Sequence, residues 1–126
     1  MIVYEFNGTF ECKNLSDLLI VLKHRSSSNS NDFELRTECE YPYLTILIKD
    51  DYACVHFFSD ENDSGHCACS SEKCTTENYV VFNIGSEKDL SEISMDIVIS
   101  VEQAYEAAKC FFEKHEMSEK IKWTSL

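Results

Sequence analysis

The chain contains few of the residues, proline and glycine, that interrupt helices and strands. Among its 126 residues there are one Pro and three Gly, so few positions break a helix or a strand. Core-forming side chains are plentiful, because 44% of the residues are hydrophobic and 12% are aromatic. Disordered segments lack such residues, and a chain of this size buries roughly two thirds of its unfolded surface without a metal or a disulfide. We therefore expect residues 1–126 to form a single globular domain.

Basic residues are scarce. Lys and Arg total 11 against 23 Asp and Glu, which gives a formal net charge of −12. A field of this sign repels the phosphates of nucleic acids, so we expect no direct nucleic-acid partner. The same field attracts a basic protein and accelerates its docking, although solubility alone is an adequate reason for such a charge.

Long hydrophobic runs are absent as well. No stretch approaches the roughly 20 apolar residues of a membrane span. The first ten residues, MIVYEFNGTF, carry no positively charged leader. We expect a cytoplasmic protein with no membrane contact, in which the seven cysteines remain reduced thiols.

The pattern of apolar residues predicts strands in the middle of the chain. Residues 43–49 (YLTILIK) and 52–58 (YACVHFF) form the two arms of a hairpin across Asp50 and Asp51. Residues 43–49 are largely apolar on both faces, which is typical of a central strand in a sheet covered on both sides. Further strands are expected at residues 2–6, 33–40, 79–84, 97–99 and 120–123, with a polar loop from Ser59 to Thr76.

Two helices are expected, one near each end of the chain. Asn14 caps the first, in which Leu15, Leu18, Leu19 and Leu22 share one face. Ser100 and Gln103 form a capping box for the second, which continues to about His115. The predicted fold class is α+β: a mostly antiparallel β-sheet meander with two α-helices, near the N-terminus and the C-terminus, packed on it.

The stretch Gly65–Cys74, GHCACSSEKC, concentrates one histidine and three cysteines in the predicted loop. Structural zinc needs four N or S ligands. These usually come as two pairs, and the two ligands of a pair are separated by two to four residues. Here Cys67 and Cys69 are separated by one residue, and no second pair occurs. Reduced loop thiols are the favoured interpretation, and no cofactor is expected. The alternative is a metal-binding or redox-sensing module built on His66, Cys67, Cys69 and Cys74.

A cysteine nucleophile with a histidine base is a weaker alternative, of the hydrolase or transferase kind. His56 and His66 lie near the cysteines in sequence, but Asp60, Glu61 and Asp63 surround them. Acidic neighbours raise the pKa of a thiol, which opposes formation of the reactive thiolate. No nucleophile elbow, phosphate-binding glycine loop or HExxH motif occurs, so we expect a protein that is not an enzyme.

Four segments resemble one family of bacterial proteins. Residues 43–58 resemble its central hairpin, and Gly65-His66 stands where the family has a Gly-containing loop. Residues 99–112 (ISVEQAYEAAKCFF) resemble its C-terminal helix, and Ile121-Lys122-Trp123 its closing motif. This family is the first-numbered group of immunity proteins in polymorphic toxin systems. The resemblance covers residues 41–126; the family's Pro near Ser118 is missing, and the loop cysteines are outside its pattern.

The resemblance implies a cytosolic immunity protein. Such a protein binds a cognate secreted or contact-delivered toxin domain, a nuclease or a deaminase encoded by a neighbouring gene, and neutralises it by occluding the active site. We expect a monomer or weak homodimer. Charge and loop position, not the resemblance, select the partner-binding residues: Asp50, Asp51, Tyr52, Phe58, Asp60, Glu61 and Asp63.

Overall fold

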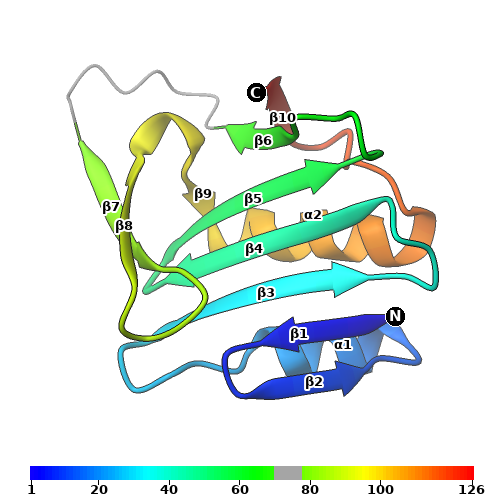
Figure 1. The fold of residues 1–126 in the computed structure, drawn as a ribbon, viewed down its shortest axis with the longest axis horizontal. Helices are drawn as coiled ribbons and strands as arrows, with labels where there is room; N and C mark the ends of the chain where they lie inside the picture. The colour runs from blue at the N-terminus through cyan, green and yellow to red at the C-terminus, as the bar shows by residue number, and fades with distance from the viewer. Residues whose placement is uncertain (70–77) are drawn as a thin grey trace.

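A computed structural model describes residues 1–69 and 78–126. Its main element is one antiparallel sheet with the strand order β10-β6-β5-β4-β3-β1-β2, in which β9 also pairs with β5 (Figure 1). Strands β7 and β8 form a separate hairpin. The elements are β1 (Ile2–Glu5), β2 (Gly8–Glu11), α1 (Leu15–Leu22), β3 (Ser30–Arg36), β4 (Tyr43–Lys49), β5 (Tyr52–Phe58), β6 (His66–Cys69), β7 (Tyr79–Asn83), β8 (Leu90–Ser94), the 3-10 helix η1 (Met95–Ile97), β9 (Ile99–Ser100), α2 (Val101–Lys114) and β10 (Lys122–Ser125).

The predicted α+β class is confirmed, and so is the central hairpin. Strands β4 and β5 have the predicted bounds and pair from Tyr43 with Phe58 to Lys49 with Tyr52. The turn between them contains Asp50 with a φ of 54°, a left-handed conformation that Asp tolerates better than most residues. This hairpin occupies the middle of the sheet.

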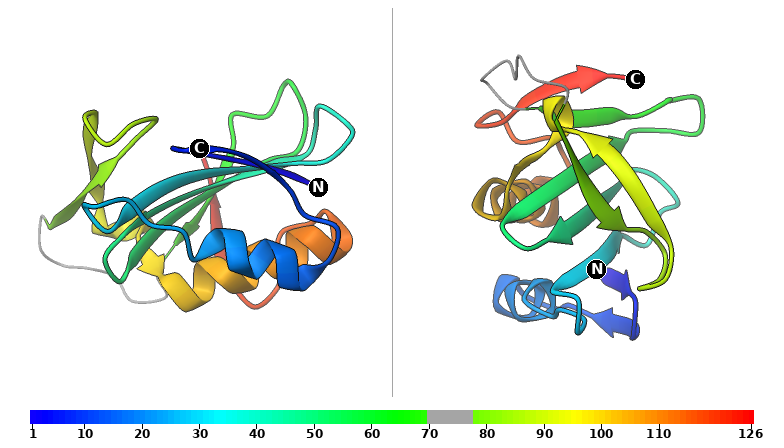
Figure 2. Two further views of the ribbon diagram at one scale, coloured as in Figure 1. Left: turned by 90° about the horizontal axis from the view of Figure 1, so that it is seen from below. Right: turned by 90° about the vertical axis from the view of Figure 1, so that its left-hand side faces the viewer.

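Both helices pack on the same face of the sheet (Figure 2). Each begins at its predicted cap: Asn14 Oδ1 accepts a hydrogen bond from the Asp17 backbone N–H at 2.9 Å, and Ser100 and Gln103 form a capping box. The apolar side chains between helices and sheet form the main core. Its fully buried members include Val3, Leu18, Leu22, Phe33, Leu35, Leu44, Ile46, Ile48, Val55 and Phe111.

Among the described residues, the cover on the opposite face of the sheet lies at one end. There the β7–β8 hairpin lies over a small second core of Leu47, Cys54, Phe82 and Val98 (Figure 2). Asp32 of β3 fastens the hairpin, because its Oδ2 accepts a hydrogen bond of 2.8 Å from the Gly85 backbone N–H. The prediction that β4 is covered on both faces is therefore right at Leu47 and wrong at Tyr43 and Thr45, which lie beyond the hairpin and are half-buried.

Three short strands were not predicted. Strands β2 and β8 are rich in polar residues. Within the described part of the chain each pairs with a single neighbour, so neither shows the apolar pattern of a buried strand. Strand β6 falls inside the predicted loop from Ser59 to Thr76, and that prediction is wrong for His66–Cys69. All four residues pair with β10 on one side, His66 and Cys67 also pair with β5 on the other, and Cys67 and Ala68 are fully buried.

The strand predicted at residues 33–40 is displaced toward the N-terminus. β3 begins at Ser30, where it pairs with Lys49, and it ends at Arg36 opposite Tyr43. Pairing with the full length of β4 determines these bounds. In the described part of the chain no helix has the length and apolarity needed to cross a membrane.

The contact between α2 and the sheet predicts a difference between two adjacent phenylalanines. Phe111 is fully buried and meets Phe57 edge-on at 6.2 Å, whereas Phe112 is half-buried at the rim of the core. Phe111→Ala should lower the free energy of unfolding by about 3–5 kcal/mol in a urea titration. Phe112→Ala makes the same change in helix propensity and should lower the free energy of unfolding clearly less. Equal losses in the two variants would contradict the placement of α2.

Candidate protein-interaction surface

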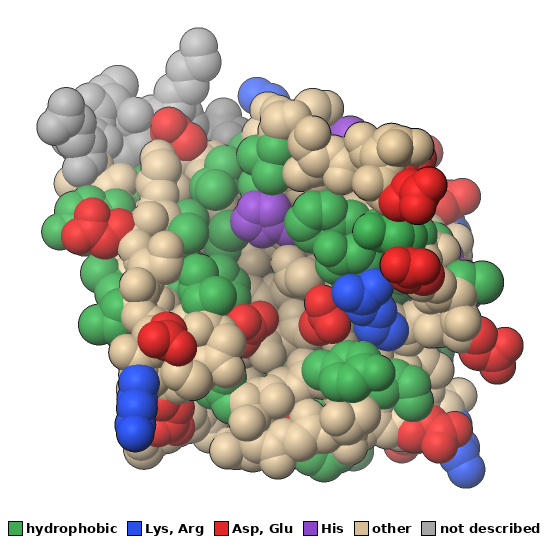
Figure 3. Space-filling model, viewed as in Figure 1, with side chains coloured by type: hydrophobic (Ala, Val, Ile, Leu, Met, Phe, Trp, Pro, Cys, Tyr) green, Lys and Arg blue, Asp and Glu red, His purple; other side chains and the backbone are tan. Residues whose placement is uncertain are grey.

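Alternation along β1, β3, β4 and β5 divides their side chains between two environments. Val3, Phe33, Leu35 and Ile46 point to the helices and are fully buried. Their alternate neighbours point to the other face, and beyond the β7–β8 hairpin nothing in the described chain covers them. We call this surface the open sheet face. It consists of Tyr4, Asp32, Glu34, Arg36, Tyr43, Thr45, His56 and Phe58, all of which are half-buried or exposed (Figure 3).

Stacked side chains occupy one half of the open sheet face. The Arg36 guanidinium lies 3.7 Å from the centre of the Tyr43 ring, and Tyr43 stacks on Phe58 at 4.6 Å with an 18° angle between planes. Tyr43 and Phe58 are register partners across β4 and β5, so the sheet itself positions the stack. Tyr41 and His56 extend it, at 5.4 Å from Tyr43 and 6.2 Å from Phe58.

Two polar contacts hold Arg36 over the stack. Its Nη2 donates to Glu34 Oε1 at 3.1 Å, and its Nη1 donates to the Glu40 backbone carbonyl at 2.9 Å. A side chain fixed in this way loses little conformational entropy when a partner binds. Arg36, Tyr43 and Phe58 therefore form a rigid, partly apolar platform.

An acidic hollow of about 390 Å³ occupies the other half, between the sheet and the tip of the β7–β8 hairpin. Asp32 and Glu34 line it with Tyr4, Thr45, Leu47 and Gly85. Burial raises the pKa of Asp32; the hydrogen bond from Gly85 opposes this shift, and the negative charge of Glu34 adds to it. A cation entering the hollow would relieve the repulsion between the two carboxylates.

A thiol and an imidazole approach each other beside the stack. Cys54 Sγ lies 3.8 Å from His56 Nδ1. Burial, assisted by the neighbouring Cys67, raises the pKa of the Cys54 thiol to about 12, and burial lowers the pKa of His56. The pair is therefore a neutral thiol beside a neutral imidazole, whereas a cysteine nucleophile requires a thiolate.

The metal-site alternative is not supported by the described residues. His66 and Cys67 are successive in β6, so their side chains point to opposite faces of the sheet. His66 faces Asp63 Oδ2 and Ser125 Oγ, each at 3.3 Å, and Cys69 Sγ lies 3.5 Å from the Lys122 carbonyl. Within residues 1–69 and 78–126 no three His, Cys, Asp or Glu side chains form a metal-binding group. Cys74 lies outside the described residues.

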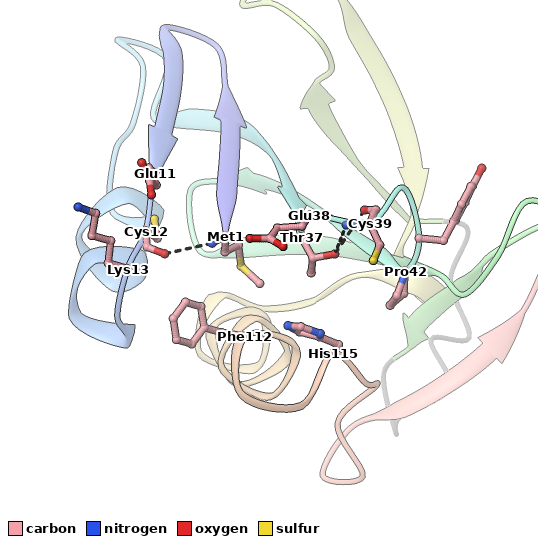
Figure 4. Close-up of a pocket in the computed structure, with 11 residues that line it drawn as sticks. Met1, Glu11, Cys12, Lys13, Thr37, Glu38, Cys39, Pro42, Phe112 and His115 are labelled. Carbon is pink, nitrogen blue, oxygen red and sulfur yellow. Dashed lines mark hydrogen bonds between the residues drawn. The ribbon is translucent and has the colours of Figure 1, made fainter.

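A second cavity, of about 590 Å³, opens beside the C-terminal end of α2 (Figure 4). Met1, Cys39, Phe112 and His115 are among its lining residues. The N-terminal amine donates to the Cys12 carbonyl at 3.2 Å, and the Cys39 backbone N–H donates to Thr37 Oγ1 at 3.2 Å (Figure 4). Both bonds satisfy polar groups of the segments that line the cavity. Among the described lining residues, no cysteine thiol lies within hydrogen-bond distance of a basic side chain.

Comparison with known proteins gives one informative relationship. No family model matches the chain. The chain is 32% identical over 123 residues to a protein of Burkholderia cenocepacia (strain H111) named double-stranded DNA deaminase immunity protein, and the match covers 97% of each chain. The chain belongs to this family of immunity proteins. The resemblance found in the sequence is thereby confirmed, and within an immunity-protein family the open sheet face is a candidate for protein contact rather than for catalysis.

The residues predicted to contact the partner of this immunity protein lie at opposite ends of β5. Asp50, Asp51 and Tyr52 lie at one end, whereas Phe58, Asp60, Glu61 and Asp63 lie at the other, and the seven-residue strand β5 runs from Tyr52 to Phe58. The structure therefore does not gather them into one patch. Three of the acids already accept hydrogen bonds from within the chain: Asp50 Oδ1 from Asn29 Nδ2 at 3.2 Å, Asp60 Oδ1 from the Asn62 backbone N–H at 2.8 Å, and Asp63 from its own loop.

Asp63 closes its own loop. Its carboxylate accepts hydrogen bonds from the backbone N–H groups of Ser59 at 2.9 Å and Gly65 at 2.8 Å, and from Ser59 Oγ at 2.8 Å. These bonds, assisted by the nearby His66, lower the pKa of Asp63 to about 2. Of the predicted set, only Phe58 belongs to the open sheet face.

The sequence prediction missed the rest of the open sheet face. The signal that identifies its charged part is the alternation of Asp32, Glu34 and Arg36 with buried Phe33 and Leu35. That pattern places three charges on one face of a strand, but it does not show that the face remains uncovered. Whether the face is uncovered depends on where the β7–β8 hairpin lies.

The hydrogen bonds of Asp63 predict a pH-dependent contribution to stability. The pKa of Asp63 lies below its ordinary value of 3.8, so the ionised carboxylate stabilises the folded state above that pH. This contribution is lost as the pH falls through about 4 toward 2. Asp63→Asn should be less stable than wild type near neutral pH, by urea titration, and the difference should shrink over that window.

Glu61→Gln is the matched control, since Glu61 is exposed in the same loop. It should change stability little across the same pH range. A difference between Asp63→Asn and wild type that stays constant down to about pH 2 would contradict the assignment.

Proposed function

We propose that the chain is a cytoplasmic immunity protein that binds a DNA deaminase toxin domain and neutralises it by covering its active site. The observation that carries the proposal is the relationship to the double-stranded DNA deaminase immunity protein. Because that relationship covers 97% of both chains, it includes the central sheet, both helices and the hairpin together. The expected source of the toxin is a neighbouring gene.

The net charge supports a partner that acts on DNA. Such an enzyme holds the phosphate backbone with Lys and Arg side chains. A protein with a formal charge of −12 is attracted to a surface of that kind and competes there with the nucleic acid. The charge thus favours occlusion of the substrate groove as the mode of neutralisation.

The state of the thiols agrees with a binding role. Occlusion requires a stable complex and no chemical step, and the pKa values of Cys54 and Cys67 are raised by burial to about 12 and about 11. Within this proposal the chain is not an enzyme. The exposed acids at the two ends of β5, Asp50, Asp51, Asp60 and Glu61, steer the toxin electrostatically.

Binding and inhibition should coincide at one equivalent. Titration calorimetry of this chain into the toxin domain should give a one-to-one complex with a nanomolar or lower Kd. Deamination of double-stranded DNA by the toxin should fall to background at the same ratio. A folded toxin that neither binds the chain nor loses activity would refute the proposed function, and binding with undiminished activity would refute occlusion.

A further inference from the structure

We propose that the open sheet face is the surface on which the toxin docks. In this arrangement a Lys or Arg of the toxin enters the acidic hollow, and apolar toxin side chains cover the platform of Arg36, Tyr43 and Phe58. The inference rests on the proposed function and adds the location of the contact. It assigns binding to a sheet face, whereas the sequence prediction selected acids of the loops at the two ends of β5, together with Tyr52 and Phe58.

The first argument is that no element within residues 1–69 and 78–126 covers this face. Both helices pack on the other side, and the β7–β8 hairpin reaches only as far as Leu47 and Cys54. The central strands consequently present partly exposed aromatic rings on a rigid backbone. Tyr and Arg are enriched among the residues that dominate interface energetics, and side chains already held by cross-strand stacking lose little conformational entropy on binding.

Charge complementarity is the second argument, and it identifies the occupant. Asp32 and Glu34 project into the hollow from alternate positions of β3, roughly 7 Å apart along the strand. Arg36, which pairs with Glu34 Oε1 at 3.1 Å, offsets one of these two carboxylate charges, so the pair with Asp32 keeps a net negative charge. The hollow is therefore complementary to a cationic side chain, and a toxin that binds DNA carries such side chains around its substrate groove.

The competing surfaces are weaker candidates. The acids at the ends of β5 are separated by the length of that strand. Asp50 accepts a hydrogen bond from Asn29, which precedes β3, and Asp60 accepts one within its own turn. The cavity at the end of α2 has charges of both signs in its lining, from Lys13, Glu11 and Glu38, and no stacked pair of aromatic rings occurs among its described lining residues. Only the open sheet face combines an aromatic platform with an acidic recess among the described residues.

The first test compares open-face variants with matched controls against the same catalytically inactive toxin domain. Tyr43→Ala and the double variant Asp32→Asn/Glu34→Gln should each weaken binding about 30-fold or more. Asn at position 32 keeps an acceptor for the Gly85 N–H. Tyr79→Ala, on the outer side of the hairpin, and Glu113→Gln/Glu116→Gln, at the end of α2, should change the Kd less than about threefold.

Association and dissociation rates distinguish residues that contact the bound toxin from residues that only attract it electrostatically. The open-face variants should mainly accelerate dissociation, whereas neutralising Asp50, Asp51, Asp60 and Glu61 together should mainly slow association at low salt. Wild type that fails to bind would refute the proposed function itself. Wild type that binds, with open-face variants that bind equally well, would overturn the docking surface alone.

Footprinting of the unmodified chain keeps the test independent of variant folding. Hydroxyl-radical labelling of Tyr43, Phe58 and His56 should fall when the toxin domain is added, whereas labelling of Tyr79 should not change. Unchanged labelling in a saturated complex would overturn the proposal. Protection that depends on the concentration of the free chain would mean that a second copy occupies the face, which would overturn it as well.

Discussion

The alternation of side chains along β3, β4 and β5 is the constraint on which the rest of the structure depends. On one face of these strands, Phe33, Ile46 and Val55 are fully buried against the helices. On the other face, the same strands present charges and partly exposed rings. A shift of one residue in register would exchange the two faces, so the main core fixes the geometry of the open sheet face. Binding and stability therefore use opposite sides of the same backbone.

The β7–β8 hairpin determines how much of that second face remains accessible. It covers Leu47 and Cys54 with Phe82, and its tip is fastened by the bond from Gly85 to Asp32. Asp32 thus has two roles, since one oxygen holds the hairpin and the side chain also lines the acidic hollow. The hollow exists because the hairpin stops at that point instead of continuing over Thr45 and Tyr43.

Sequence reasoning predicted the elements whose signals are local. The bounds of β4 and β5, the Asn14 cap and the Ser100–Gln103 box all follow from patterns of a few residues, and the structure has them as predicted. Strand β6 was missed because its pairing with β10 joins residues that are more than fifty positions apart. No local pattern reports that contact, and the polar residues on both sides of His66–Cys69 suggested a loop.

The candidate surface was predictable only in part for the same reason. Charge indicated a basic partner, and Phe58 was selected as an anchor. The stack of Phe58 with Tyr43 and Arg36 depends on the register of β4 against both neighbours, which the sequence does not state. The sequence also does not show that a loop acid such as Asp63 accepts the backbone hydrogen bonds that hold its own loop.

The central claim is that this chain occupies the surface that the toxin uses for DNA. The most direct measurement is a competition experiment, in which labelled double-stranded DNA and increasing amounts of this chain are mixed with a catalytically inactive toxin domain. The account predicts that DNA is displaced in proportion to complex formation, with no species containing all three components. A stable ternary complex of toxin, DNA and this chain would contradict it.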